Sequence, residues 1–200
     1  MSVIEPEGLA MPRLTKDQTR RKLRNAVVYE AVDKGFAALS VADVVKRAQV
    51  SAGTIYVHFE NKTDMLQQVY MELKEEFHET ITRRRDTTPT AAMIRAMWFD
   101  MFDWIADHPR EFLFLDLGAA AHLLTEDQQA KADSYAEDIA ALLRRGVLDG
   151  TLAPLDTKLL SLLLTAPAMQ MARGAVMRGQ PIPRDSIEQT FERVWLSIAA

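Results

Sequence analysis

Apolar residues recur at helical spacing along almost the whole chain, and this feature constrains the fold more than any other. The 200 residues include only 8 Gly and 8 Pro, and no stretch of alternating β-branched residues is long enough for a sheet. The pattern therefore predicts an all-α protein of about nine helices. They are expected at residues 15–34, 41–48, 50–59, 61–85, 90–107, 109–117, 125–146, 156–178 and 185–200.

Charge divides the chain into a basic and an acidic part. Residues 13–62 carry ten Lys and Arg against five Asp and Glu, whereas residues 63–200 carry 14 basic and 21 acidic side chains. The net charge of −4 alone argues against nucleic acid, but this division favours a basic reader of nucleic acid joined to an acidic body. The alternative is that the asymmetry arose by chance.

Several classes of protein are excluded by what the sequence lacks. With no Cys, the chain can have no disulfide, no thiol nucleophile and no cysteine zinc finger, and it suits a reducing cytoplasm. The N-terminus lacks an apolar signal core, and the longest uncharged apolar run, residues 159–172, falls short of the ~18–20 needed to span a bilayer. No phosphate loop, zinc-protease motif or nucleophile elbow is present. We therefore expect no enzyme, cofactor, metal or membrane partner.

The stretch 50–59 carries chemistry suited to a nucleic acid. Its apolar positions can face a core, while Thr54, Tyr56 and His58 reach outward, with Lys62 just beyond. Such side chains can donate to phosphate oxygens and touch base edges in a major groove. The alternative is a half-buried helix and loop whose polar residues merely face water.

The preceding residues supply the partner helix. Ser40 is typical of an N-cap, and Asp43 three residues later fits a capping box that opens a helix over residues 41–48. A tight turn at 49–51 then leads into the stretch 50–59. Two short helices joined this closely predict a helix-turn-helix with the second in the recognition position.

Residues 54–66, Thr-Ile-Tyr-Val-His-Phe-Glu-Asn-Lys-Thr-Asp-Met-Leu, resemble the signature of the TetR family of transcriptional regulators. The similarity covers about residues 17–77, and the remainder is similar only in helical layout. The resemblance implies a homodimer with an N-terminal three-helix DNA-binding domain and a larger C-terminal domain for ligand binding and dimerisation. The corresponding division is an N-terminal flexible arm at 1–14, a helix-turn-helix domain at 15–62 and a body at 63–200.

The same resemblance implies which residues contact DNA. Thr54, Tyr56 and His58 become groove or backbone contacts, and Lys62 becomes a phosphate contact at a helix N-terminus. At the start of the first helix of the motif, Ser40 and Val41 would approach the opposite groove wall. At the start of the second helix, the candidates are Ser51, Ala52 and Gly53. Two residues depart from the family pattern. Gln49 stands where a turn Gly is usual, which predicts a left-handed non-Gly residue, and Ala52 stands where a longer polar side chain often reads a base.

The body contains a cluster of large, soft side chains that could line a ligand pocket. Met is flexible and polarizable, so cavities lined by Met and aromatic residues adapt to varied apolar ligands. The alternative is that these residues form ordinary core. His122 with Asp116 could orient a ligand or serve only the structure. The pocket candidates are Trp98, Met101, Phe102, Trp104, Phe112, Tyr135 and Met169.

The last two expected helices have broad apolar faces and no later partner in the chain. A second copy related by a two-fold axis would cover them in an intermolecular four-helix bundle. The alternative is that both helices pack only on their own body. The dimerisation candidates are Leu163, Ala168, Ala172, Ala175, Phe191, Val194 and Trp195.

These observations predict a cytoplasmic repressor that binds a double-stranded, palindromic operator as a homodimer. A small apolar or amphipathic effector would release it by shifting the fourth helix and the paired recognition helices. Half-sites about one helical turn apart, ~34 Å, would match those helices. The alternatives are an activator, a regulator of the same fold without a ligand, and a helical interaction protein that does not bind DNA.

Overall fold

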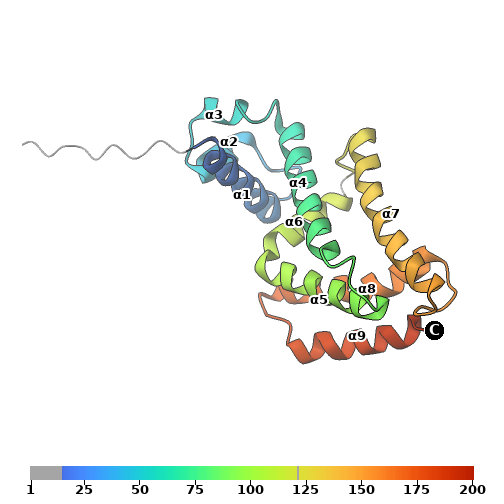
Figure 1. The fold of residues 1–200 in the computed structure, drawn as a ribbon. Helices are drawn as coiled ribbons and strands as arrows, with labels where there is room; N and C mark the ends of the chain where they lie inside the picture. The colour runs from blue at the N-terminus through green and yellow to red at the C-terminus, as the bar shows by residue number, and fades with distance from the viewer. Residues whose placement is uncertain (1–14, 121) are drawn as a thin grey trace, which may run out of the picture.

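The computed structural model describes residues 15–120 and 122–200, which form nine α-helices and no β-strand, as predicted (Figure 1). The predicted arm at 1–14 lies outside the described residues. Helices α1 to α3 form one end of the molecule, α4 leads from that end into the body, and α8 and α9 form the opposite end. The helices are α1 (Lys16–Lys34), α2 (Val41–Ala48), α3 (Ala52–Tyr56), α4 (Lys62–Thr82), α5 (Thr90–Asp107), α6 (Pro109–Ala120), α7 (Glu126–Leu148), α8 (Thr157–Arg178) and α9 (Arg184–Ile198).

Local capping signals explain why the helix boundaries lie close to those expected. Thr15 and Gln18 form a reciprocal capping box at the start of α1, and Asn61 caps α4. Ser40 caps α2, and its hydroxyl also donates to Asp43 at 2.6 Å. Because these bonds involve residues three apart, they can be recognised without knowing the tertiary fold.

The core of the N-terminal end extends into the body. Apolar side chains of α1, α2 and α3 pack against the first half of α4 and against Phe114 of α6. Phe36, in the loop after α1, lies with its ring centroid 5.0 Å from that of Phe114. Because the core is closely packed, a movement of α6 would displace side chains of the N-terminal helices. The buried residues of this core include Leu23, Val27, Val44, Ile55, Phe59, Met65, Val69 and Leu73.

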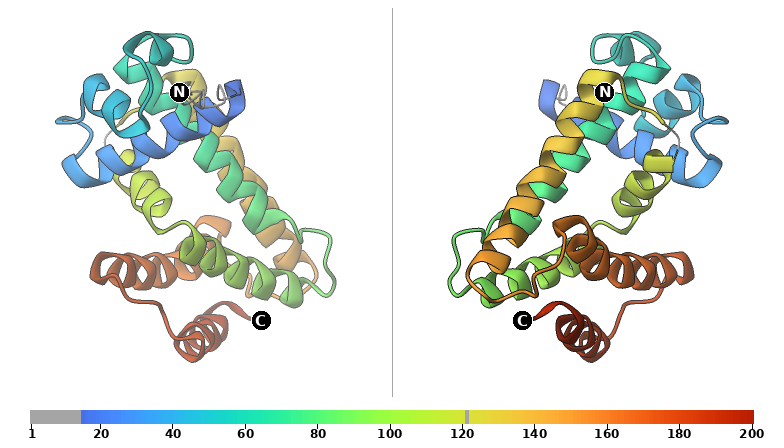
Figure 2. Two further views of the ribbon diagram at one scale, coloured as in Figure 1. Left: turned by 90° about the vertical axis from the view of Figure 1, so that its left-hand side faces the viewer. Right: turned by 90° about the vertical axis from the view of Figure 1, so that its right-hand side faces the viewer.

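A second core fills the body between α5, the later part of α7, α8 and α9. Helix α5 runs through its middle and contributes Trp98, Phe99 and Phe102, and Phe191 of α9 packs against Trp98 with ring centroids 5.5 Å apart. Helix α7 lies along α4, as the two side views show (Figure 2). The body is thus a helical bundle whose first helix, α4, also belongs to the N-terminal core.

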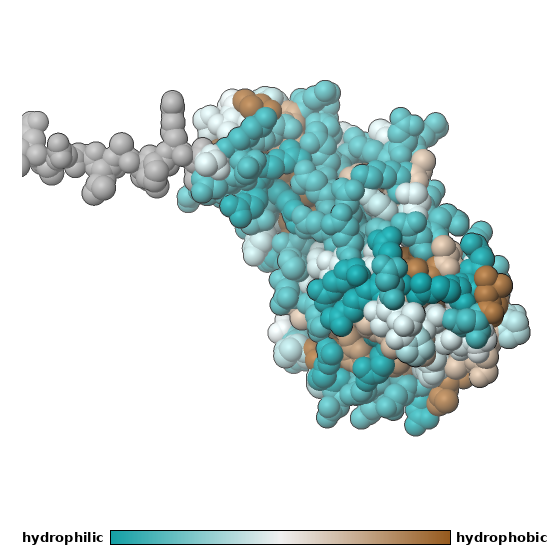
Figure 3. Space-filling model, viewed as in Figure 1, coloured by the Kyte–Doolittle hydropathy of each residue, from teal (hydrophilic) through white to brown (hydrophobic). Residues whose placement is uncertain are grey.

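Helix α8 exposes much of its apolar surface. Among the described residues it is the one helix long and apolar enough to cross a membrane by composition, with a mean hydropathy of 1.3 and 28% of the tested window buried. A helix that packs against protein can meet the same criterion. Figure 3 shows a largely hydrophilic face, with small hydrophobic patches at the N-terminal tip, at the right edge of the body and at its lower edge.

Candidate DNA-binding face and ligand pocket

Helix α3 and the segment after it are each anchored by one apolar residue, and the other side of α3 faces solvent. Ile55 is 1% exposed and Phe59 is 3% exposed, so both are fixed in the N-terminal core. Tyr56 is 62% exposed, and Ser51 caps the helix by accepting from the backbone N–H of Thr54. The candidates Ala52 and Gly53 are exposed as well. Ser51, Ala52, Gly53 and Tyr56 thus lie exposed on one short helix and its cap, and Thr54 is half-exposed on the same helix.

The turn before α3 has the geometry that its sequence predicts. Gln49 adopts φ 56° and ψ 47°, so a non-Gly residue does occupy the left-handed region. Its N–H bonds to Lys46 O, and the N–H of Val50 bonds to Val45 O at 3.3 Å, which together form a Schellman motif. This turn determines how α2 and α3 meet. Val41, Ala52 and Tyr56 line one shallow depression between the two helices.

Arg20 of α1 positions the segment that follows α3, although sequence reasoning did not select it. Its guanidinium donates to the backbone oxygen of His58 at 3.3 Å and lies 4.3 Å from the ring centroid of Phe59. It also pairs with Glu72 and donates to Gln68 at 3.0 Å, both on α4. One side chain therefore ties α1, the segment after α3 and α4 together. In the sequence Arg20 is one of several basic residues in a row, so nothing distinguishes it.

His58 and Lys62 are less freely available than Tyr56. Burial, followed by the nearby charges of Arg20 and Lys16, lowers the pKa of His58, so the free protein carries a neutral imidazole near pH 7. The Lys62 amino group donates to the backbone oxygen of Ala37 at 2.9 Å. A phosphate contact by Lys62 would have to share or replace that hydrogen bond.

Ion pairs neutralise much of the basic charge counted in the N-terminal part. Arg24 pairs with Glu76 of α4, while Lys34 and Arg47 both pair with the buried Glu30. The positive charge available to a polyanion is therefore smaller than the sequence count suggests. Among the described residues, the exposed cations of this part without an ion pair are Lys16, Arg21, Lys22 and Lys46.

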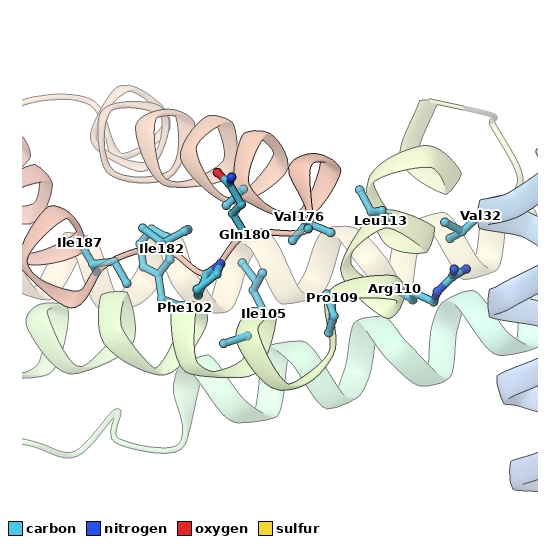
Figure 4. Close-up of a pocket in the computed structure, with 14 residues that line it drawn as sticks. Val32, Phe102, Ile105, Pro109, Arg110, Leu113, Val176, Gln180, Ile182 and Ile187 are labelled. Carbon is cyan, nitrogen blue, oxygen red and sulfur yellow. The ribbon is translucent and has the colours of Figure 1, made fainter.

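The body contains an apolar pocket of about 500 Å³ that reaches the N-terminal part (Figure 4). It lies between the end of α5, the start of α6, the end of α8 and the loop before α9, and Val32 of α1 closes one end. This volume is typical of a small-molecule site. Only Arg110 and Gln180 contribute polar side chains. The remaining lining residues are Phe102, Ile105, Ala106, Pro109, Leu113, Ala175, Val176, Gly179, Pro181, Ile182 and Ile187.

Of the seven predicted pocket residues, only Phe102 lines this pocket. Trp98, Met101, Trp104 and Phe112 are buried in the body core, where neighbouring helices fill the space around them. Tyr135 stacks on His78 with ring centroids 4.6 Å apart, and Met169 is a partly buried residue packed on the core. The ordinary-core alternative describes most of this set. The pocket seen in the structure forms at helix ends and a loop, which helical periodicity does not reveal.

The predicted dimerisation residues are also mostly internal. Ala168, Ala172, Ala175, Phe191 and Val194 are buried within the protomer, whereas Leu163 and Trp195 are partly exposed. This differs from the expectation because an apolar helix face can pack on its own body as well as on a partner. The exposed large apolar residues of α8 and α9 are instead Leu159, Leu162, Met177 and Leu196.

Asp116 and His122 do not form a site together. Asp116 pairs with Arg173 of α8 at 2.5 Å, and His122 is exposed with a φ of 47°. Within residues 15–120 and 122–200, no group of three or more His, Asp or Glu side chains is placed to hold a metal ion.

Both halves of the chain match known sequence families. Residues 28–69 match the family described as bacterial regulatory proteins, tetR family, and residues 89–199 match the tetracyclin repressor-like C-terminal domain. The chain belongs to the TetR family. It is therefore a DNA-binding transcriptional regulator, with the helix-turn-helix formed by α2 and α3.

Relatives of this TetR-family protein are regulators as well. An uncharacterized HTH-type transcriptional regulator of Haemophilus influenzae is 25% identical over 186 residues, covering 86% of this chain and 93% of the relative. The HTH-type transcriptional activator FasR of Mycolicibacterium smegmatis is 24% identical over 190 residues, covering 92% and 84%.

Solved structures share the fold over nearly the full length. A TetR family transcription regulator from Marinobacter aquaeolei superposes with a TM-score of 0.82 at 22% identity, covering 92% of this chain and 96% of that one. The fatty acid degradation regulator FadR from Bacillus halodurans superposes with a TM-score of 0.71 at 19% identity, covering 88% and 97%.

Proposed function

We propose that this TetR-family regulator is a homodimeric repressor that a small apolar or amphipathic molecule releases from its operator. The observation that carries the proposal is the placement of the pocket, which is bounded by α6 and by Val32 of α1. Helix α1 also packs on α2 of the helix-turn-helix. A ligand in this pocket would therefore touch the helix that carries the DNA-reading unit.

DNA contact is assigned to the exposed side of α3 and the start of α2. Tyr56 and Thr54 would reach the groove, and Ser51, Ala52 and Gly53 allow the backbone to approach closely. Ser40 and Val41 would face the opposite groove wall. His58 and Lys62 would contact phosphates, assisted by the unpaired cations Lys16, Arg21, Lys22 and Lys46.

A homodimer would bury the apolar surface that the single chain leaves exposed. Leu159 and Leu162 lie on α8 with 42% and 59% of their surface exposed, and Leu196 lies on α9 with 72% exposed. The protein would then present two copies of α3 to half-sites about one helical turn, ~34 Å, apart. The two-fold symmetry of this arrangement favours a palindromic operator. The protein would act in the compartment that holds the DNA, which for the bacterial relatives is the cytoplasm.

The effector would act by preferring one of two dimer shapes. Because α6 shares its core with α1 and α4, ligand-induced movement of α6 would reorient both helices and change the spacing of the recognition helices. A ligand that binds more tightly to the dimer shape that does not fit the operator lowers operator affinity. The largest possible decrease is the ratio of the ligand's affinities for the two shapes. Neither the helix-turn-helix nor the pocket requires catalysis, a cofactor or a metal for this function.

The test begins with duplexes selected from a random pool by the full-length chain. Fluorescence anisotropy would then follow one labelled duplex as apolar and amphipathic compounds are added. We expect at least one compound to bind the protein and weaken duplex binding tenfold or more. A protein that holds its duplex equally well with every bound compound would contradict ligand control.

Activation is the second candidate, because the relative FasR is named an activator. In vitro transcription from a promoter that contains the selected site separates the two. A repressor lowers transcription until ligand is added, whereas an activator raises it.

A further inference from the structure

The lining of the pocket carries one positive charge and no negative charge. Arg110 is the only ionisable side chain among the lining residues, and Gln180 is the only other polar one. Figure 4 shows Arg110 near Val32 at the end of the pocket next to α1, with Ile182 and Ile187 toward the other end. An apolar chamber with a guanidinium at one end matches a molecule that is apolar along its length and anionic at one terminus.

We infer that the effector is an amphipathic monocarboxylate whose carboxylate takes Arg110 away from Asp33, an inference that rests on the proposed effector function. Its apolar part would lie among Phe102, Ile105 and Ile182. Arg110 is the second residue of α6, where the helix dipole also favours an anion.

Arg110 already binds a carboxylate, and that carboxylate belongs to α1. Its Nη1 donates to Oδ1 of Asp33 at 2.7 Å, and its guanidinium lies 4.3 Å from the ring centroid of Tyr29. Both partners of the ion pair are 36% exposed, so a ligand can reach the guanidinium. The planar fork of Arg suits bidentate binding of a carboxylate. The ligand would therefore replace one carboxylate by another of the same chemistry.

Asp33 connects Arg110 to the helix-turn-helix. Its second oxygen, Oδ2, accepts from Arg47 at 2.9 Å, and Arg47 also pairs with Glu30 at 2.5 Å. Arg47 lies in the last turn of α2, two residues before Gln49 and the turn into α3. Loss of Arg110 would leave Asp33 bound to α2 alone, so the body would be uncoupled from the DNA-reading unit at this point.

The protonation state of Asp33 supports this exchange. The hydrogen bond from Arg110 is the largest cause that lowers the pKa of Asp33, and Arg47 lowers it further. Asp33 is thus a carboxylate near neutral pH, and it competes with the ligand for the same guanidinium. A neutral ligand would leave the ion pair intact, and a cationic ligand would be repelled by Arg110 and would find no carboxylate in the lining.

Calorimetric titration of the full-length chain with three probes of one tail length tests the inference. The probes are decanoate, decanol and decyltrimethylammonium, each kept below its micelle-forming concentration. We expect the wild type to bind decanoate about tenfold more tightly than decanol, because a bidentate carboxylate makes one more charge-assisted hydrogen bond to Arg110 than the single bond from Arg110 to Asp33 that it replaces. Arg110→Met should reduce decanoate affinity to that of decanol and leave decanol affinity unchanged.

Arg184→Met is the matched control. Arg184 also pairs with an aspartate, Asp103 at 2.8 Å, and also lies over an aromatic ring, Phe99 at 4.1 Å, but it does not line the pocket. This variant should bind all three probes as the wild type does. Asp33→Asn provides a second test that keeps Arg110: removing the competing charge should tighten decanoate binding several-fold without changing decanol binding.

Equal affinity for decanoate and decanol, or loss of decanoate binding in Arg184→Met as large as in Arg110→Met, would overturn the inference. Failure of the wild type to bind decanoate would overturn it as well. If decanol and decanoate both bind and both weaken duplex binding, in wild type and Arg110→Met alike, the effector function stands and the carboxylate inference fails. If decanoate binding depends on Arg110 but duplex affinity does not change, the pocket assignment stands and the proposed effector function fails.

Discussion

Replacing Gln49 by Gly should stabilise the helix-turn-helix. A non-Gly residue in the left-handed conformation costs roughly 1–2 kcal/mol, and Gln49 has φ 56° and ψ 47°. Gly removes that cost but loses about 0.5–1 kcal/mol because its unfolded chain is more flexible. Both hydrogen bonds of the Schellman motif use backbone groups, so the substitution retains them. The expected net gain is about 0.5–1 kcal/mol.

Thermal unfolding followed by circular dichroism would measure this gain. For a chain of this size, 1 kcal/mol corresponds to roughly 2–4 °C in Tm, so an increase of about 1–4 °C is expected. Hydrogen exchange of the amides of α2 and α3 would localise it. Gln49→Ala is the matched control, since it removes the same side chain and keeps the left-handed cost. A Gly variant no more stable than the Ala variant would refute the reasoning.

Two further substitutions test packing and electrostatics. Gly118→Ala should lower the free energy of unfolding by about 1–3 kcal/mol, because the added Cβ would lie 2.6 Å from Cδ2 of the buried Tyr70 ring. Urea denaturation would measure this change, and a variant as stable as the wild type would contradict the prediction. Hydrogen bonds from Lys34 and then Arg47 lower the pKa of Glu30 below 4.5. Its contribution to stability is therefore full above pH 4.5 and is lost as the pH falls through the lower folded-state pKa. Glu30→Gln should flatten the acid side of the stability curve, and an unchanged curve would count against the ion pairs.

Local signals made most of the fold predictable. The caps at Thr15, Ser40, Asn61 and Thr125 each involve residues three apart, so the sequence alone locates the helix starts within a residue or so. The left-handed residue at Gln49 was likewise predictable, because the family that the sequence resembles usually has Gly at this position of the turn. The exposed face of α3 follows from the spacing of its apolar anchors.

The pocket was not predictable in the same way. Phe102 and Trp98 lie one turn apart on α5 and look alike in the sequence, yet only Phe102 borders the cavity. Phe102 meets the pocket beside Pro181 and Ile182, from a loop about 80 residues away, whereas Trp98 packs against Phe191 of α9. Ala175 illustrates the same limit, since the sequence suggested a dimer contact for it and gave no sign that it lines the pocket.

Long-range ion pairs were also hidden from sequence reasoning. Arg20 and Arg24 look like part of a basic surface for DNA, but they pair with Glu72 and Glu76, both 52 residues further along the chain. Such pairs depend on the packing of α1 against α4. The sequence therefore overstated the free positive charge, while it identified the DNA-reading module correctly.

Selection of duplex DNA from a random pool tests the central claim most directly, with the full-length wild type, Tyr56→Ala and Leu148→Ala compared side by side. Tyr56 and Leu148 are both largely exposed, 62% and 82%, so neither change should unfold the protein, but only Tyr56 lies on α3. We predict that the wild type and Leu148→Ala enrich the same palindromic sequence and that Tyr56→Ala loses that enrichment. Enrichment of no sequence by the wild type, or the same sequence enriched by Tyr56→Ala, would contradict the account.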